Sequence, residues 1–281
     1  RDFFETGNTF VNTLALSNGT ENSSVRFSYT HSDIGSIMPS STVERNNFNL
    51  RGFTQLNDKL TLDAKVTYFL QDAKNRPTQG TEGAMAYVWP LARNVRISDL
   101  KDYQDIENPI DPNNPYRVIA PTSNGGNPYW MLQNDFNGDK RKRILGFVKL
   151  DYQITDWLSA FARVGTDAIS QDTESYIATG HHFFPEGSIR FLKDEKTETN
   201  YDFLITANKD LSDSFNLVVN AGGNMRHSTA IQSVVSGQDF KIPGRYFLAN
   251  TDGDQITASQ TDLVEKRVNS LYGQASLSFD D

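Results

Sequence analysis

The chain has no cysteine and no long apolar run. Without cysteine it can form neither a disulfide framework nor a thiolate metal site. No stretch of about eighteen consecutive apolar residues is present, which excludes a transmembrane helix. Basic residues are also scarce relative to acidic ones, and the net charge of -8 argues against non-specific binding of nucleic acid. We therefore expect no nucleic-acid partner.

Proline is rare outside one segment of the chain. Of the 10 prolines, seven fall within residues 77–128: Pro77, Pro90, Pro109, Pro112, Pro115, Pro121 and Pro128. The surrounding segment, residues 72–141, shows neither a helical nor a strand period, so we predict a long loop that is functional or disordered. Within it, short helices are expected in 81–93 and 97–104. Two further loops are predicted at 168–196 and 226–265.

Alternation of apolar and polar residues dominates the rest of the sequence, most clearly in 144–167. There Ile144, Val148 and Leu150 share one face of a predicted strand, and Lys149 and Asp151 share the other. A short turn at 155–156 leads into a second alternating strand. The pattern predicts a long antiparallel hairpin. Strands in soluble domains are usually about five or six residues long, and the predicted strands are longer. They reach the length of about nine to eleven residues that crosses a bilayer.

About nine strands are predicted in all, and the connections between them alternate between short and long. Membrane β-barrels have short periplasmic turns and longer extracellular loops, whereas a β-sandwich has no reason for this alternation. Tyr152, Trp157 and Phe215 lie near short turns, where an aromatic girdle is expected. The expected strands cover residues 10–17, 25–30, 47–51, 60–71, 144–154, 158–167, 201–207, 215–221 and 271–279.

Charged residues gather on the polar sides of these strands. One interpretation is a charged barrel lumen that contacts a plug and a solute, and the other is a solvated interior in which the charges simply pair. Either interpretation requires a wet lumen. The residues predicted to face it are Asp63, Lys65, Lys149, Asp151 and Arg163.

Aromatic residues are frequent in the first long loop, among many Asn and Asp. Rings and amides suit a neutral sugar, so four of these aromatics are candidate substrate-binding residues: Tyr87, Trp89, Tyr103 and Tyr116. Alternatively, loop aromatics pack a small core or a partner protein. The second interpretation is favoured for Tyr129 and Trp130.

No motif for catalysis, a metal or a cofactor is found. His181 and His182 are adjacent rather than spaced to share a metal, and residues 250–254 lack the final glutamate of a calcium loop. Nucleophile-elbow, phosphate-loop and dinucleotide fingerprints are absent. We expect a protein that is not an enzyme and that needs no metal or cofactor.

Several blocks in this order resemble the SusC/RagA family of TonB-dependent outer-membrane transporters. They are RDFFETG at 1–7, RNNFNLRG at 45–52, DKLTLDAKVTY at 58–68, NPYWML at 127–132, TDWLS at 155–159, RVGTD at 163–167 and RVNSLYGQASLSF at 267–279. The resemblance implies an all-β, antiparallel transmembrane β-barrel of about 22 strands in the outer membrane of a Gram-negative bacterium. It also implies energised import of oligosaccharides or peptides, with a SusD-like surface lipoprotein over the barrel and TonB acting through a plug.

We expect residues 1–281 to be part of the barrel domain of such a transporter. An odd number of strands would leave two unpaired edges, which the bilayer core does not tolerate. The C-terminal barrel strands are therefore expected outside this sequence, and the resemblance implies that the N-terminal plug domain lies outside it as well. Two alternatives stay open: a passive outer-membrane porin, and a secreted, soluble carbohydrate-binding β protein.

Overall fold

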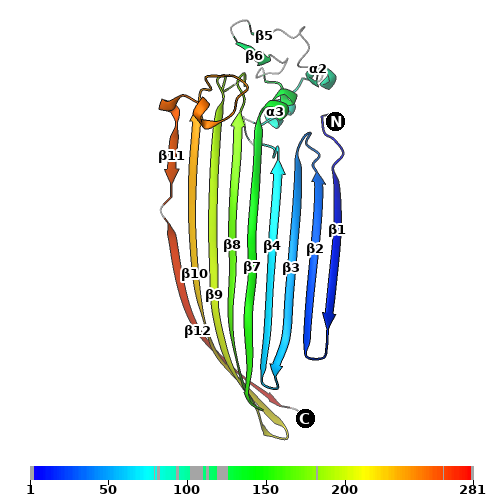
Figure 1. Ribbon diagram of the computed structural model, residues 1–281, viewed down its shortest axis with the longest axis vertical. Helices are drawn as coiled ribbons and strands as arrows, with labels where there is room; N and C mark the ends of the chain where they lie inside the picture. The colour runs from blue at the N-terminus through cyan, green and yellow to red at the C-terminus, as the bar shows by residue number, and fades with distance from the viewer. Residues whose placement is uncertain are drawn as a thin grey trace.

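The computed structural model describes residues 3–78, 80, 83–92, 95–101, 110–111, 114–118, 126–181, 183–261 and 263–279. Its main feature is one antiparallel sheet of ten strands (Figure 1), in which each strand pairs with the next strand of the sheet along the chain, except that the last two strands both pair with the one before them. The strands are β1 (Asn8–Gly19), β2 (Ser23–Gly35), β3 (Thr42–Asn57), β4 (Leu60–Lys74), β7 (Phe136–Thr155), β8 (Leu158–Ile177), β9 (Ser188–Ser212), β10 (Phe215–Gln238), β11 (Thr257–Gln260) and β12 (Val264–Phe279). A separate small pair is formed by β5 (Ile110–Asp111) and β6 (Asn114–Val118).

The last strand of the sheet is interrupted. Both β11 and β12 pair with β10, β11 along 233–236 and β12 along 215–230. At the break, the Thr261 backbone N–H donates to the Gln232 carbonyl at 2.9 Å, and the Thr261 hydroxyl accepts the Gln232 N–H at 2.9 Å. Because β11 and β12 occupy one position in succession, the sheet has the nine strand positions that the sequence predicts.

The predicted alternation of short and long connections is confirmed. The tight turns at 20–22, 58–59, 156–157 and 213–214 share one end of the sheet, and the longer connections share the other. In Figure 1 the tight turns lie at the bottom, and the helices and irregular segments lie at the top. The top end carries α1 (Met85–Val88), α2 (Ile97–Lys101), α3 (Pro128–Asn134) and the 3₁₀ turns η1 (Leu248–Asn250) and η2 (Gly253–Gln255). None of the helices in the described ranges is long and apolar enough to cross a membrane.

The predicted extents of the loops are wrong, because the strands continue into them. β8 runs to Ile177, β9 begins at Ser188, β10 runs to Gln238 and β7 begins at Phe136. In these upper parts polar residues occupy both faces, as in the Lys193–Lys196 run of β9. Backbone pairing continues there, but the alternation of apolar and polar residues that predicts a strand from sequence stops.

Candidate functional site: the polar face of the sheet

The two faces of the sheet differ sharply in chemistry. Side chains alternate between faces along a strand and align with their register partners on neighbouring strands. On β7 the even-numbered residues from Ile144 to Ile154 are apolar apart from Gly146, and they continue across the sheet through the partners Leu62 and Ala162 of Leu150. This apolar band covers residues 144–154, close to the about nine to eleven residues that a strand needs to cross a bilayer.

Aromatic side chains mark both ends of the band. Toward the long connections, Tyr29, Phe48 and Tyr68 are register partners whose rings stack at 4.8 and 6.5 Å between centroids. Toward the tight turns, the rings of Phe215 and Phe279 lie 5.0 Å apart. The sequence singles out Tyr152, Trp157 and Phe215 at the turn end but misses the row at the other end, whose members come from three separate strands.

The opposite face of the sheet is polar, and all five charged residues predicted from the sequence lie on it. Asp63, Lys149 and Arg163 are successive register partners across β4, β7 and β8. Lys65 is two positions beyond Asp63, and Asp151 is two beyond Lys149, so both project to the same side.

Carboxylates on this polar face are matched by basic partners. Arg51 contacts both oxygens of Asp63 at 3.1 and 2.9 Å, and Arg143 contacts both oxygens of Asp167 at 2.8 and 2.5 Å. The other pairs are Arg76–Asp139, Lys149–Asp151 at 2.6 Å, Arg163–Asp202 at 2.8 Å, Lys196–Asp194 at 3.7 Å and Arg226–Glu198 at 3.9 Å. Asp210, near the turn end, accepts a hydrogen bond from Asn216 at 2.8 Å instead.

Several cations on the same face have no carboxylate partner among the described residues. Arg45 donates to the Gln71 amide oxygen at 3.0 Å, and Arg141 donates to the Gln171 amide oxygen at 3.1 and 2.8 Å. These amides are neutral, so the positive charges of the two arginines stay uncompensated. Arg26, Lys65 and Arg190 are exposed and make no ion pair within the described ranges.

A hollow opens in the polar face where β8 carries Gly165. The space measures about 340 Å³ and is bordered by Phe147, Asp167, Glu198 and Asn200 among others. A Cβ added at Gly165 would meet no atom closer than 3.6 Å, so the glycine leaves space open at this position. In register, Gly165 lies between Phe147 and Asn200.

The connections at the top end form what we call the loop cap, namely the described residues of 75–135, 178–187 and 239–256. Its core contains Tyr87, Trp130, Met131 and Ala178, with Tyr246 packed against them. A Cβ at Gly126 would lie 2.3 Å from the Tyr87 ring, so only glycine fits there. Buried apolar residues of the chain concentrate in this part of the molecule.

The four aromatics predicted to bind substrate end up in different settings. Tyr87 is fully buried in the loop cap, and its hydroxyl has no hydrogen-bond partner among the described residues. Trp89 is 87% exposed, so its ring is free to meet a ligand. Tyr103 and the side chain of Tyr116 lie outside the described residues. In this structure Tyr87 supports the alternative interpretation, a small loop core.

The sequence analysis does not predict α3, although the start of this helix carries a recognisable N-cap signal. The Asn127 side chain accepts the N–H groups of Tyr129 and Trp130 at 2.9 and 3.2 Å, and Pro128 occupies the first helical position. Asn as an N-cap followed by Pro is a common helix start. The same side chain donates to the Leu100 carbonyl at 2.9 Å, which ties α3 to α2.

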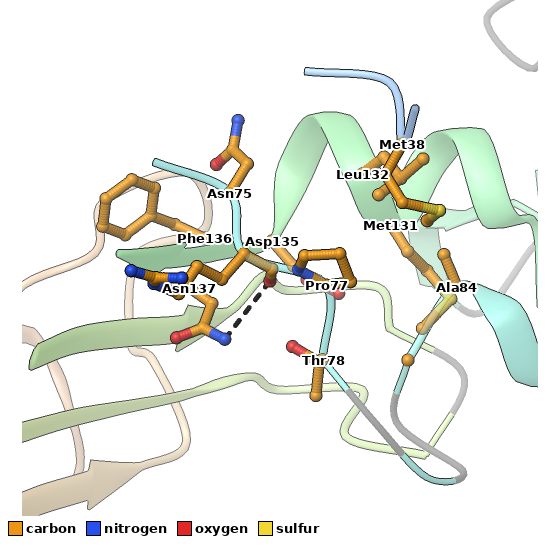
Figure 2. A pocket seen from close by; sticks show the side chains of 12 residues that line it. Met38, Asn75, Pro77, Thr78, Ala84, Met131, Leu132, Asp135, Phe136 and Asn137 are labelled. Carbon is orange, nitrogen blue, oxygen red and sulfur yellow. Dashed lines mark hydrogen bonds between the residues drawn. The ribbon is translucent and has the colours of Figure 1, made fainter. Parts of the chain in front are cut away.

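At the end of α3, the Asp135 side chain is largely buried in the loop cap, with 19% of its surface exposed. Its carboxylate accepts the Ala178 N–H at 2.8 Å and lies 3.8 Å from Nε2 of His181. Burial raises the pKa of the Asp135 carboxyl to about 7, although the Ala178 hydrogen bond opposes the shift. A small pocket of about 40 Å³ adjoins Asp135 between Met38, Pro77, Ala84 and Met131, and Figure 2 shows the Asn137 amide bonded at its edge to the Arg76 carbonyl at 3.2 Å.

No cluster suited to a metal is found among the described residues. Asn250, in the segment with calcium-like composition, instead holds its own loop by donating to the carbonyls of Ile242 and Arg245 at 2.8 and 2.7 Å. His182 lies outside the described residues. The polar face thus combines fixed charges with a hollow.

Comparison with solved structures finds proteins of similar fold. The RagAB peptide importer in its closed-closed state matches 99% of this chain with a TM-score of 0.72 at 16% sequence identity. A structure of the RagAB peptide transporter matches 97% with a TM-score of 0.75 at 15% identity. The chain has the fold of a SusC/RagA-like barrel.

Another solved structure is similar to the chain at a lower TM-score. FpvA of P. aeruginosa, bound to heterologous pyoverdines, matches 99% of the chain with a TM-score of 0.55 at 13% identity. The chain spans 31%, 30% and 34% of the lengths of these three structures. No family model matches the sequence, and no curated protein matches it significantly. The predicted fold class, an antiparallel β-barrel segment, is confirmed.

Proposed function

We propose that this chain is part of the barrel domain of an outer-membrane importer for oligosaccharides or peptides. The observation that carries the proposal is the division of one SusC/RagA-like sheet into an apolar face of bilayer length and a charged polar face with a hollow. The apolar face would meet lipid and the polar face would line the lumen. A plug domain and further strands would complete the barrel outside residues 1–281.

The energy source and the partner are inferred from the resemblance. In this proposal TonB acts through the plug, and a SusD-like lipoprotein covers the extracellular end. The loop cap lies at that end, and the exposed ring of Trp89 is its most accessible aromatic in the described residues. The similarity to the RagAB peptide importers supports a peptide cargo, whereas the aromatic residues of the first long loop support a sugar cargo.

The test uses the complete protein in its native host. Short epitope tags inserted at Glu186 or Asp252 should be accessible on intact cells, and tags at Asp156 or Asp213 should not. Uptake of fluorescent peptide and oligosaccharide libraries should depend on this protein and stop when TonB is deleted. Uptake that continues without TonB would indicate a passive porin, and a native protein soluble without detergent would indicate a secreted binding protein.

A further inference from the structure

The cations without carboxylate partners form a descending series on the polar face. Arg190 is the register partner of Ser175 on β8, Arg141 is the partner of Gln171, and Lys65 is the partner of Phe147, which faces Gly165. The positions 175, 171 and 165 on β8 run from the loop-cap end toward the turn end. Arg45 shares the level of Arg141 through Gln71, and Arg26 shares the level of Lys65 through Arg51.

The lowest level of the series is the most unusual. Arg26, Arg51 and Lys65 are direct register partners on three neighbouring strands, and among the described residues Asp63 is the only carboxylate bound to any of them. Like charges directly opposite one another destabilise a sheet. The arrangement is therefore unfavourable for the sheet alone and becomes favourable when an anion is present.

Another pair of neighbouring cations on the same face carries no surplus of positive charge. Lys149 and Arg163 are also direct register partners, but each contacts its own carboxylate, Asp151 at 2.6 Å and Asp202 at 2.8 Å. Their charges are compensated within the chain. The surplus is thus confined to particular levels, although the whole chain has a net charge of -8.

We propose that Arg190, Arg45, Arg141, Lys65 and Arg26 form a cationic track that binds and conducts a solute carrying several carboxylates. This inference rests on the proposed function, because it requires the polar face to line the lumen. Rings of Arg and Lys make pores selective for anions. Strands lie about 4.8 Å apart, so Arg26 on β2 and Lys65 on β4 would reach carboxylates spaced by about 10 Å. Phe147 and the Gly165 hollow, at the same level, would receive the uncharged parts.

Acidic peptides and uronic-acid oligosaccharides share this chemistry, and the experiment separates them. The complete transporter, purified in detergent, is titrated with fluorescent oligoglutamate, oligogalacturonate, oligolysine and oligoalanine. Two double variants remove charge from the track, R45Q/R141Q and R26Q/K65Q, and the second leaves the Arg51–Asp63 pair intact. The matched control, K140Q/K142Q, removes two exposed lysines from the opposite face of β7.

Each track variant should raise the Kd for at least one of the polycarboxylate probes about tenfold at low salt, because two charge contacts are lost together; a tenfold change corresponds to about 1.4 kcal/mol. Binding of oligoalanine, and all binding by K140Q/K142Q, should be unchanged. Whichever probe responds identifies the source of the carboxylates.

Unchanged affinity of both polycarboxylates in both track variants would overturn the proposal. So would a result in which R26Q/K65Q makes the plug sensitive to protease but leaves probe binding unaltered, because the surplus charge would then serve the plug. These equilibrium measurements do not depend on transport. Failure of the wild-type protein to import any probe in cells would sink the proposed function while leaving the binding result standing.

Discussion

The sheet and the loop cap use apolar side chains in opposite ways. In the loop cap, Tyr87 and Met131 are buried at 0% and 4% exposure, as in any protein that folds in water. In the sheet, Val148 and Leu150 remain 51% and 40% exposed, and nothing in the described chain covers them. Hydrophobic burial within the chain therefore holds the cap together, while the apolar band of the sheet is left to meet a different, apolar surrounding.

The polar groups of the two regions also differ in their exposure to water. On the polar face of the sheet the ion pairs are partly exposed, with the Arg163 and Asp202 side chains at 45% and 13%. In the cap, the Tyr87 hydroxyl is fully buried, and burial raises the pKa of the Asp135 carboxyl. Charged groups in the sheet should therefore respond weakly to substitution, and enclosed groups in the cap should respond strongly.

The largest effect should come from placing a charge on the apolar band. Leu150→Arg in the complete barrel should destabilise it by about 2 to 4 kcal/mol, the cost of Arg at the lipid face near the midplane. The matched change Leu145→Arg, on the polar face of the same strand, should cost little. Unfolding of both variants from lipid vesicles in urea measures the difference. Equal costs would mean that the two faces have the same surroundings.

Much of the sheet is predictable because the apolar band imposes a period of two on the sequence. Strand positions, the alternation of connections and the placing of the five charged residues on one face follow from that period. Above Tyr29 and Tyr68 the period disappears, since polar residues occupy both faces of β9 and β10 there. Backbone pairing continues through these upper strands, but no period in the sequence marks it.

The loop cap was less predictable for a different reason. The burial of Tyr87 depends on Gly126, Trp130 and Ala178, which are distant in sequence and follow no period. A loop aromatic that binds sugar and one that fills a core look alike until its neighbours are known. The Asn127–Pro128 start of α3 was readable, but as a local helix signal rather than as part of a family motif.

A smaller effect is expected from pH on the loop cap. Because the pKa of Asp135 is about 7 when buried and 3.8 when exposed, the closed cap retains a proton that the opened cap releases. The free energy of opening should thus fall as the pH rises from about 4 to about 7, by about 2 to 3 kcal/mol between pH 5 and pH 8. Hydrogen exchange of the α3 amides measures this change.

Asp135→Asn serves as the control for that measurement. The amide oxygen can still accept the Ala178 N–H, but the group no longer titrates near neutrality. The variant should lose most of the pH dependence between pH 5 and pH 8 and should be more stable than wild type at the upper end. A retained pH dependence would assign the titration to another group, with the neighbouring His181 as the first to examine.

Removing the Tyr87 hydroxyl should have an effect of about 1 kcal/mol in the stabilising direction. A buried polar atom without a partner carries its desolvation cost uncompensated, and Tyr87→Phe keeps the ring against Trp130 and Met131. Hydrogen exchange of the cap should slow slightly, and solute binding should not change. Weaker solute binding with unchanged cap stability would restore Tyr87 as a substrate-binding residue.

The smallest effect is expected for an ion pair on the polar face. The Arg163–Asp202 contact is partly exposed to water, so a double-mutant cycle with Arg163→Gln and Asp202→Asn should give a coupling energy of about 0.2 to 1 kcal/mol. That value should shrink in high salt, because screening weakens exposed pairs. Asp202 also accepts a hydrogen bond from Asn224 at 2.6 Å, and Asn224→Ala measures that contribution separately. A coupling energy of several kcal/mol, insensitive to salt, would show that the polar face is shielded from water, and the contrast between the wet wall of the sheet and the dry interior of the cap would fail.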